Sequence, residues 1–420
     1  METRNMEKKF LGFSKLEWSW IMVDWGNSAF ATVCMAAVLP VFYKIVSAHG
    51  VPNALSTAYW AYANFIAALI VALSFPILGA IADNSLGRKR FFFVFTLLGV
   101  LSTFFIYFTG KGDYVWVAIL YILATIGFAG SEVFYNSFLP IISPSEKRDR
   151  LSSYGYALGY LGGGLLLAID ILFILNPSKF GFSSPVLAMR FSFITVSLWW
   201  FIFSLPFIFV VKDLQPVSDK IVSVGYKFKN FLFIFYDMIK EPEVFKFLLA
   251  FWLYNDGVVT IIKMATAYGV EIGIRSNDLI IAILLTQFVG IPFTILFGTI
   301  TRKIKTKYAI LIAIMVYIGI TFWGAFMKSA LEFYLLAILV GTVQGGIQSL
   351  SRSLYSRLIP QEKSAQFFGL YALSSKFSTI LGPLVFGIVA QFTGSGRNSI
   401  FSLVVFFIVG GLLLLKVKDK

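Results

Sequence analysis

The sequence is poor in charged residues and in the side chains that metal sites and many active sites need. Only 13% of its 420 residues are Asp, Glu, Lys or Arg, against about 25% in soluble domains. Cys34 is the single cysteine, which excludes an internal disulfide framework, and His49 is the single histidine. We therefore expect no metal site, no cofactor and no enzymatic activity.

Two further signals are absent. No G-x-x-x-x-G-K-[ST] motif occurs, so a solute or ion gradient, not a nucleotide, is the expected source of energy. No cleavable signal peptide is evident, because the first apolar run is long, contains Asp24 and lacks a small-residue cleavage site. We expect this run to remain in the membrane as an anchor.

What the sequence has in abundance is long apolar runs, since 58% of its residues are hydrophobic and 18% are aromatic. A hydrocarbon core about 30 Å thick is crossed by ~20 apolar helical residues. Continuous runs of this length exclude barrel strands, in which apolar residues alternate. The pattern predicts an all-α integral membrane protein with twelve transmembrane helices, near residues 18–43, 58–82, 91–109, 114–139, 151–175, 186–211, 243–270, 277–300, 307–327, 331–356, 365–392 and 397–416.

The formal net charge of +14 is explained by membrane topology better than by nucleic-acid binding. Most of the 35 lysines and arginines fall in the two tails and in alternate loops. This positive-inside bias predicts that both termini are cytoplasmic. We expect a multi-pass protein of the cell membrane that contacts the lipid bilayer, binds no nucleic acid and acts as a monomer.

The longest polar connection, residues 212–242, divides the predicted spans into two sets of six. We expect an N-terminal six-helix bundle over 1–211 and a C-terminal one over 243–420, with an amphipathic helix in the linker on the inner membrane surface. The two halves look related, because Asp24-Trp25-Gly26 in the first span is matched by Asp256-Gly257 in the seventh. Two such halves with a site between them are typical of transporters that work by alternating access.

The loop after the second span has a glycine, three intervening residues, an aspartate, three more residues, a second glycine and then a basic cluster. A glycine lets two helices approach closely, and an aspartate can accept from a helix N-terminus while basic side chains hold it. The loop resembles the signature loop of the major facilitator superfamily, in which it is a conformational latch and not a substrate site. The residues concerned are Gly79, Asp83, Gly87, Arg88, Lys89 and Arg90. The alternative interpretation is a basic turn that serves only topology.

Other stretches resemble the vacuolar amino-acid effluxer family, an autophagy-related branch of that superfamily with prokaryotic relatives. Val23, Gly26 and Val259 depart from the family pattern, and Val259 removes one polar contact from the implied pathway. The resemblance covers essentially the whole chain and implies transport of amino acids. It is carried by the stretches Asp24 to Phe30, Tyr254 to Gly257 and Gly345 to Ser353, and by the glycine-rich run after Tyr154.

Ionisable and polar residues lie inside several predicted spans, where charges are rare unless they face water or one another. In the superfamily arrangement, spans 1, 4, 7 and 10 line the central cavity. The substrate pathway predicted on this basis contains Asp24, Asn27, Asp256, Lys263, Gln348, Arg352 and Lys376.

The roles of the three predicted proton-coupling carboxylates differ by depth. Asp256 lies deep in its span and is the preferred candidate for binding a proton or the solute. Asp24 lies roughly 9 Å from the inner interface at ~1.5 Å per residue, so pairing with Arg352 in an inner gate is as plausible as coupling. Glu132 lies near the inner end of its span, where a cytoplasmic gate is favoured over ligand contact.

Two structural roles are also expected. Gly155, Gly159 and Gly163 recur every four residues in the fifth span, a pattern that permits close helix packing in lipid. Asp170 and Arg190, near the outer ends of the fifth and sixth spans, are expected to pair.

The sequence is thus read as that of a secondary active transporter for a small, zwitterionic solute such as an amino acid. A carboxylate in a cavity of balanced charge can bind a proton in one state and release it in another, which would couple transport to protons. Two alternatives stay open. One is the same fold with sugars, peptidoglycan fragments or a lipid-like molecule as cargo, and the other is a sensor or scaffold that does not transport.

Overall fold

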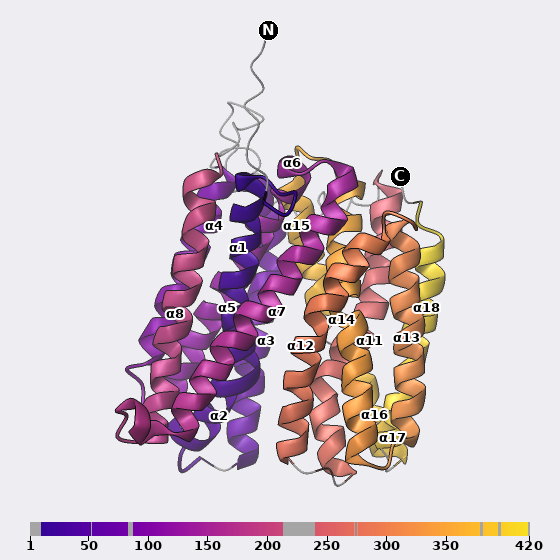
Figure 1. Cartoon of the computed structure of the whole chain (residues 1–420). Helices are drawn as coiled ribbons and strands as arrows, with labels where there is room; N and C mark the ends of the chain where they lie inside the picture. Colours follow the sequence, from indigo (N-terminus) through magenta and orange to yellow (C-terminus); the bar gives the residue numbers. More distant parts are fainter. Residues whose placement is uncertain are drawn as a thin grey trace. The chain divides into compact units, whose positions relative to one another are not determined.

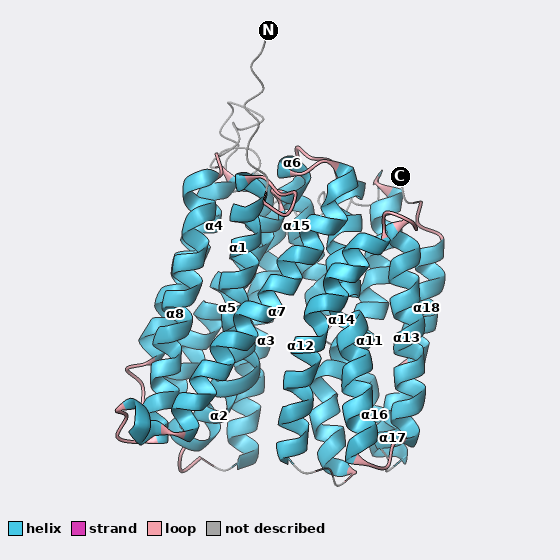
Figure 2. Ribbon diagram, viewed as in Figure 1, coloured by secondary structure: helices cyan, strands magenta, loops and turns pink. Residues whose placement is uncertain are grey.

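The computed structural model describes residues 10–51, 53–82, 87–212, 240–272, 274, 276–378, 381–393 and 396–418. Within these ranges the secondary structure is helical, and no strand occurs beyond an isolated β-bridge between Phe10 and Phe13 (Figure 2). Ten helices in this part of the chain are long and apolar enough to cross a membrane. The prediction of an all-α membrane protein is confirmed at this level.

Two of the twelve predicted spans fall outside these ten helices. The predicted span 58–82 coincides with α3 (Asn53–Ile81), in which the apolar stretch is Ile66–Phe75. The predicted span 365–392 is shared by two shorter helices, α15 (Ser364–Phe377) and α16 (Leu381–Thr393). The number of twelve spans therefore stays a prediction.

The chain divides into two compact units. The first contains the described residues up to Ser143 and those from Leu158 to Lys212. Its first span is a continuous series of helical segments, two of them π-helical. Besides α3, the helices of this unit are α1 (Lys15–Ala29), η1 (Phe30–Ala37), α2 (Val38–Phe42), η2 (Tyr43–Ser47), α4 (Arg88–Ile106), α5 (Tyr114–Asn136), α6 (Leu139–Ile142), η4 (Pro177–Phe180) and α8 (Pro185–Val210), together with part of α7 (Ser145–Leu175) (Figure 1).

Local sequence explains where the first span begins and how it packs. Ser14 and Glu17 form a reciprocal capping box, in which the Glu17 N–H donates to Ser14 Oγ at 3.2 Å and the Ser14 N–H donates to Glu17 Oε2 at 2.8 Å. Further along, the fully buried rings of Phe30 and Trp200 pack with centroids 5.5 Å apart. Trp200 in turn fills the space beside Gly99 on α4, where a Cβ atom would overlap the indole. The core of this unit is therefore aromatic.

The second unit contains Pro144–Ala157 and the described residues from Lys240 onward. A capping box of Ser329 and Glu332 begins its α14. This helix packs closely on α12 at Gly341, where a Cβ would lie 2.9 Å from the carbonyl oxygen of Thr286. Besides α15 and α16, the unit contains α11 (Pro242–Glu271), α12 (Ser276–Ile300), α13 (Thr306–Phe326), α14 (Ala330–Leu358), α17 (Gly396–Ser402) and α18 (Val404–Leu415) (Figure 1).

Helix α7 is shared between the units, because residues 145–157 belong to the second and residues 158–175 to the first. The sequence division at residue 211 assigns the whole of this helix to the N-terminal bundle. Contacts of the first half of α7 with α13 and α14, described below, account for the difference. The predicted amphipathic helix of the linker lies outside the described residues.

Candidate functional site

The motif Tyr254-Asn255-Asp256-Gly257 lies on α11, and its first two side chains reach two different helices. The Tyr254 hydroxyl shares a hydrogen bond of 2.6 Å with Ser351 Oγ on α14. Asn255 Nδ2 donates to Ser378 Oγ at 2.7 Å, at the residue that follows α15. Both side chains are buried. The motif therefore links α11 to the helices that surround it.

Asp256 is fully buried and contacts the beginning of α16. Its Oδ2 accepts a hydrogen bond of 2.8 Å from the backbone N–H of Gly382, the second residue of that helix. A helix N-terminus has unsatisfied N–H groups and a positive dipole end, which together favour a carboxylate. Asp256 thus anchors α16 by its N-terminus.

Glycines make the two closest approaches in this region. A Cβ at Gly382 would overlap Thr260 Oγ1 and would lie 2.7 Å from Asp256 Oδ1. A Cβ at Gly257 would lie 2.7 Å from Cζ of Phe407 on α18. A larger residue at either position would overlap these neighbouring atoms. The two glycines therefore allow the helices around Asp256 to pack closely.

Arg352 on α14 is 2% exposed and is engaged with the first half of α7. Its Nε donates to Ser152 Oγ and its Nη2 to the Ser152 carbonyl oxygen, each at 2.8 Å. The guanidinium also lies 4.3 Å from the centre of the Tyr156 ring. Arg352 therefore holds a neighbouring helix by a planar fork, which a lysine cannot reproduce. Its predicted partner Asp24 belongs to the other unit, and that pairing stays a prediction.

A second polar cluster of this unit was not singled out in the sequence. Asp149 on α7 forms an ion pair of 2.8 Å with Arg357 on α14 and accepts from Thr306 Oγ1 on α13 at 2.7 Å. Nearby, Arg148 Nη1 donates to the Ser356 carbonyl oxygen at 3.0 Å. Asp149 lies in the basic run 145–150, in which the sequence indicated only topology. An aspartate between two arginines, Arg148 and Arg150, was the signal that could have identified it.

In the first unit, the predicted pathway residues Asp24 and Asn27 are buried on α1, with exposed fractions of 6% and 2%. Glu132 is half-buried on α5. In the second unit, Gln348 is half-buried on α14. The side chains of Lys263 and Lys376 lie outside the described part of the structure.

The glycines of α7 pack against α1. A Cβ at Gly159 would lie 2.5 Å from Ser28 Oγ, and one at Gly163 would lie 2.5 Å from Thr32 Oγ1. Gly162, between them, faces the backbone of Trp25. Gly155, one turn earlier, is buried in the part of α7 that belongs to the second unit.

The predicted pairing of Asp170 with Arg190 is wrong. Asp170 is fully buried, and its Oδ1 accepts from Thr195 Oγ1 at 2.9 Å. Arg190 lies more than one helical turn before Thr195 on α8, donates its Nε to the Tyr107 carbonyl oxygen at 2.6 Å and stacks over the Tyr107 ring. A hydroxyl on the neighbouring helix reaches the carboxylate, and the guanidinium caps the end of α4 instead.

Part of the predicted latch is described. Gly87 has a φ of 78°, a left-handed conformation that favours glycine, and it precedes α4 as its N-cap. Arg88 is buried at the start of that helix and Arg90 is exposed, while Gly79 is buried near the end of α3. Asp83 lies outside the described residues.

No group of three or more His, Cys, Asp or Glu side chains in the described ranges could hold a metal ion. The polar residues of the second unit are instead joined by carboxylate, hydroxyl, amide and guanidinium hydrogen bonds. Such groups can exchange a protein partner for a solute or a proton.

Comparison with known proteins agrees with this architecture. The family described as vacuole effluxer Atg22 like matches residues 14–420. The uncharacterized MFS-type transporter YxiO of Bacillus subtilis (strain 168) is 37% identical over 417 residues, which cover 97% of this chain and 96% of that protein. Autophagy-related protein 22 of Yarrowia lipolytica (strain CLIB 122 / E 150) is 28% identical over 298 residues, which cover 63% of this chain and 50% of that protein.

Among solved structures, the human organic anion transporter MFSD10 (TETRAN) superposes with a TM-score of 0.73 at 12% identity, covering 95% of this chain and 98% of that chain. A likeness at that identity shows the fold alone. The fold is thus that of the major facilitator superfamily of membrane transporters, and the chain belongs to the Atg22-like vacuole effluxer family.

Proposed function

We propose that this protein is a secondary active transporter that moves a small zwitterionic solute, such as an amino acid, by alternating access and in exchange for or together with protons. In this proposal twelve spans form two six-helix halves, and both termini are cytoplasmic. The observation that carries it is the anchoring of α16 by Asp256, a fully buried carboxylate on a pathway helix. Membership of an effluxer family supports transport of a small molecule.

Asp256 supplies the proton step. Its carboxylate holds the N-terminus of α16 through a hydrogen bond from Gly382 that is strengthened by the negative charge. When Asp256 takes up a proton, that charge assistance and the attraction to the helix dipole are lost. Helix α16 is then free to shift against α11, so protonation and helix position are linked.

Arg352 supplies the carboxylate-binding step. Its guanidinium is now satisfied by Ser152 on the first half of α7. A solute carboxylate would compete for the same donors, because it matches the guanidinium fork better than a hydroxyl and a carbonyl do. Solute binding would thereby weaken the hold of α14 on α7. A ligand shifts an equilibrium only through such a difference in affinity between two states.

The solute ammonium group would be placed by a carboxylate of the same pathway. Asp256 and Arg352 lie on α11 and α14 of one unit, and Asp24 lies on α1 of the other. A pathway with both signs of charge suits a zwitterion better than it suits a neutral sugar. Cell-membrane localisation is supported by the bacterial relative that matches nearly the whole chain.

The test is proton-linked uptake by purified protein in liposomes, with a panel of amino acids, sugars and muropeptides. We expect amino-acid flux that responds to a pH gradient. The variant Asp256→Asn should fold, because its amide oxygen still accepts from Gly382, yet it should lose proton-driven accumulation and keep exchange of solute. Flux of another solute class alone would refute the amino-acid proposal, and unchanged proton coupling in Asp256→Asn would refute the role of this carboxylate.

A further inference from the structure

A cavity of about 140 Å³ lies inside the second unit, away from the polar contacts of Asp256 and Arg352. It is enclosed by α11, α12, α13, α14, α16 and α17 and by residues that adjoin them. Its size is close to that of an engineered protein cavity of roughly 150 Å³ that stays dry and binds benzene. The space therefore suits a molecule with a single ring.

The lining is apolar, and its chemistry favours an aromatic ring over an alkyl chain. Met264 and Met327 contribute thioethers, and Phe333, Phe386 and Tyr268 contribute rings. Sulfur atoms and ring edges make favourable contacts with aromatic groups. None of the described residues that line the cavity is charged. Apolar walls of this kind favour an uncharged occupant over a charged one.

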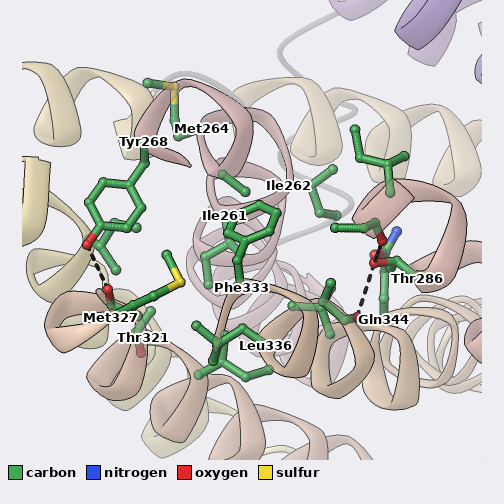
Figure 3. A pocket seen from close by; sticks show the side chains of 18 of the residues that line it. Ile261, Ile262, Met264, Tyr268, Thr286, Thr321, Met327, Phe333, Leu336 and Gln344 are labelled. Carbon is green, nitrogen blue, oxygen red and sulfur yellow. Dashed lines mark hydrogen bonds between the residues drawn. The ribbon is translucent and has the colours of Figure 1, made fainter. Parts of the chain in front are cut away.

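Most hydroxyl groups at the cavity wall are already satisfied by the protein. Thr286 Oγ1 donates to the Ala282 and Ala337 carbonyl oxygens at 2.9 and 3.1 Å, and the Tyr268 hydroxyl donates to the Gly324 carbonyl oxygen at 2.8 Å (Figure 3). These bonds keep the hydroxyls directed at backbone and leave the wall between them apolar.

Two side-chain amides at the cavity wall differ from these hydroxyl groups in their hydrogen bonding. Gln287 on α12 and Gln344 on α14 line the cavity, are half-buried and make no side-chain hydrogen bond to another residue that the structure describes. Figure 3 shows Gln344 beside Thr286 on one side of the cavity and Tyr268 and Met327 on the other. Each amide offers a donor and an acceptor to an occupant. A ligand with one hydroxyl or N–H group would match this wall.

Two aliphatic residues of the cavity wall are also exposed at the surface of the unit. They are Ile262 on α11 and Ile283 on α12, at 39% and 46% exposure. An uncharged, apolar occupant is compatible with such a wall, because it leaves no polar group unsatisfied there.

We propose that this cavity is a binding site for an uncharged, single-ring aromatic molecule that bears one hydroxyl or N–H group, of the kind represented by phenol or pyrrole. The ring occupies the apolar space among Met264, Phe333 and Met327, and the polar group bonds to an amide of Gln344 or Gln287. Helices α11 and α14 also carry Asp256 and Arg352, so an occupant stiffens the helices that bear the transport pathway without touching it.

The test uses the purified full-length protein in nanodiscs, with phenol, pyrrole and benzene as probes and the unfolding midpoint and calorimetric titration as readouts. Two matched variants on α14 distinguish binding in the cavity from binding nearby. Leu336→Trp fills the cavity, whereas Leu335→Trp alters the neighbouring, 41% exposed position, which does not line it. We expect phenol and pyrrole to raise the midpoint of the wild type and of Leu335→Trp by several degrees, and to leave Leu336→Trp unchanged.

A second variant, Gln344→Leu, tests the polar contact. It also keeps the proposal testable if Leu336→Trp does not fold. In Gln344→Leu we expect phenol to bind several-fold more weakly, with benzene unaffected. Binding that survives Leu336→Trp would overturn the site, as would a wild type that no probe stabilises. Equal effects of Gln344→Leu on phenol and benzene would overturn the role of the amide. Asp256→Asn should bind all probes normally, so failure of the transport mechanism and failure of this site are distinguishable.

Discussion

Asp256 on α11 accepts a hydrogen bond of 2.8 Å from the first turn of α16, from the backbone N–H of Gly382. The bond joins residues 126 positions apart. The carboxylate accepts from an N–H group in the first turn of the helix, as an N-cap side chain does, and it does so from a fully buried position. The position of α16 and the charge of Asp256 are therefore coupled by one contact, and that contact requires the absence of a side chain at Gly382.

Replacing Gly382 by alanine tests this close approach. The new methyl group would overlap Thr260 Oγ1 and crowd Asp256 Oδ1, so α16 must move away from α11. Overpacking of this kind costs about 1–3 kcal/mol, and we expect a lower unfolding midpoint together with loss of liposome transport.

Two comparisons make the Gly382→Ala result specific. Gly319→Ala on α13 meets nothing within 4 Å and should leave the midpoint unchanged or raise it, since alanine favours helix. Thr260→Ala in the Gly382→Ala background removes the nearest obstructing atom and should recover part of the loss. A Gly382→Ala protein as stable and active as the wild type would contradict the assignment.

Neighbouring glycines on α7 give a second test, of packing between α7 and α1. A methyl group at Gly163 would lie 2.5 Å from Thr32 Oγ1 and 2.8 Å from the Ser28 carbonyl oxygen, whereas one at Gly164 would meet nothing within 4 Å. We expect Gly163→Ala to destabilise the protein by about 1–3 kcal/mol through overpacking, and Gly164→Ala to have no such cost. Chemical unfolding of both variants measures the difference, and equal stabilities would show that α1 and α7 do not depend on this contact.

Arg352 provides a third prediction, because it donates hydrogen bonds to both the side chain and the backbone of Ser152. A lysine keeps the charge and loses the planar fork. We expect Arg352→Lys to lower the unfolding midpoint and to raise the KM for a solute that carries a carboxylate, measured in liposomes.

The matched change for Arg352→Lys is Arg397→Lys. Arg397 Nη1 donates to a single acceptor, the Ala325 carbonyl oxygen, at 3.3 Å, and a lysine can replace one bond of that kind. If Arg352→Lys transports with an unchanged KM, the guanidinium fork has no part in solute binding.

The sequence predicted the membrane class and the superfamily well, because apolar length and a local glycine–aspartate loop are properties of consecutive residues. It also singled out Asp256, whose role in transport stays a prediction. It could not identify Gly382 as the partner, since that contact depends on how α11 and α16 pack. The same limit explains the error at Asp170, where Thr195 reaches the carboxylate first and Arg190 caps a helix end. Position along a helix follows from the sequence, whereas the direction that a side chain takes around the helix depends on packing.

The ion pair of Asp149 and Arg357 is another contact between distant residues that the sequence did not predict. It gives the last prediction. The two residues are 208 positions apart, and their side chains are only 8% and 12% exposed. Removing one partner of a buried pair costs about 3–5 kcal/mol, because the other charge remains buried and uncompensated.

Asp149→Asn and Arg357→Gln should therefore each lower the stability strongly, and the double variant should be less destabilised than the sum of the two. Chemical unfolding of the three proteins measures the coupling. Lys246→Gln is the control, because Lys246 pairs with Glu243 while its own side chain is 36% exposed, and such exposed pairs contribute only about 0.2–1 kcal/mol. Strictly additive losses for Asp149→Asn and Arg357→Gln would show that the two side chains do not act as a pair.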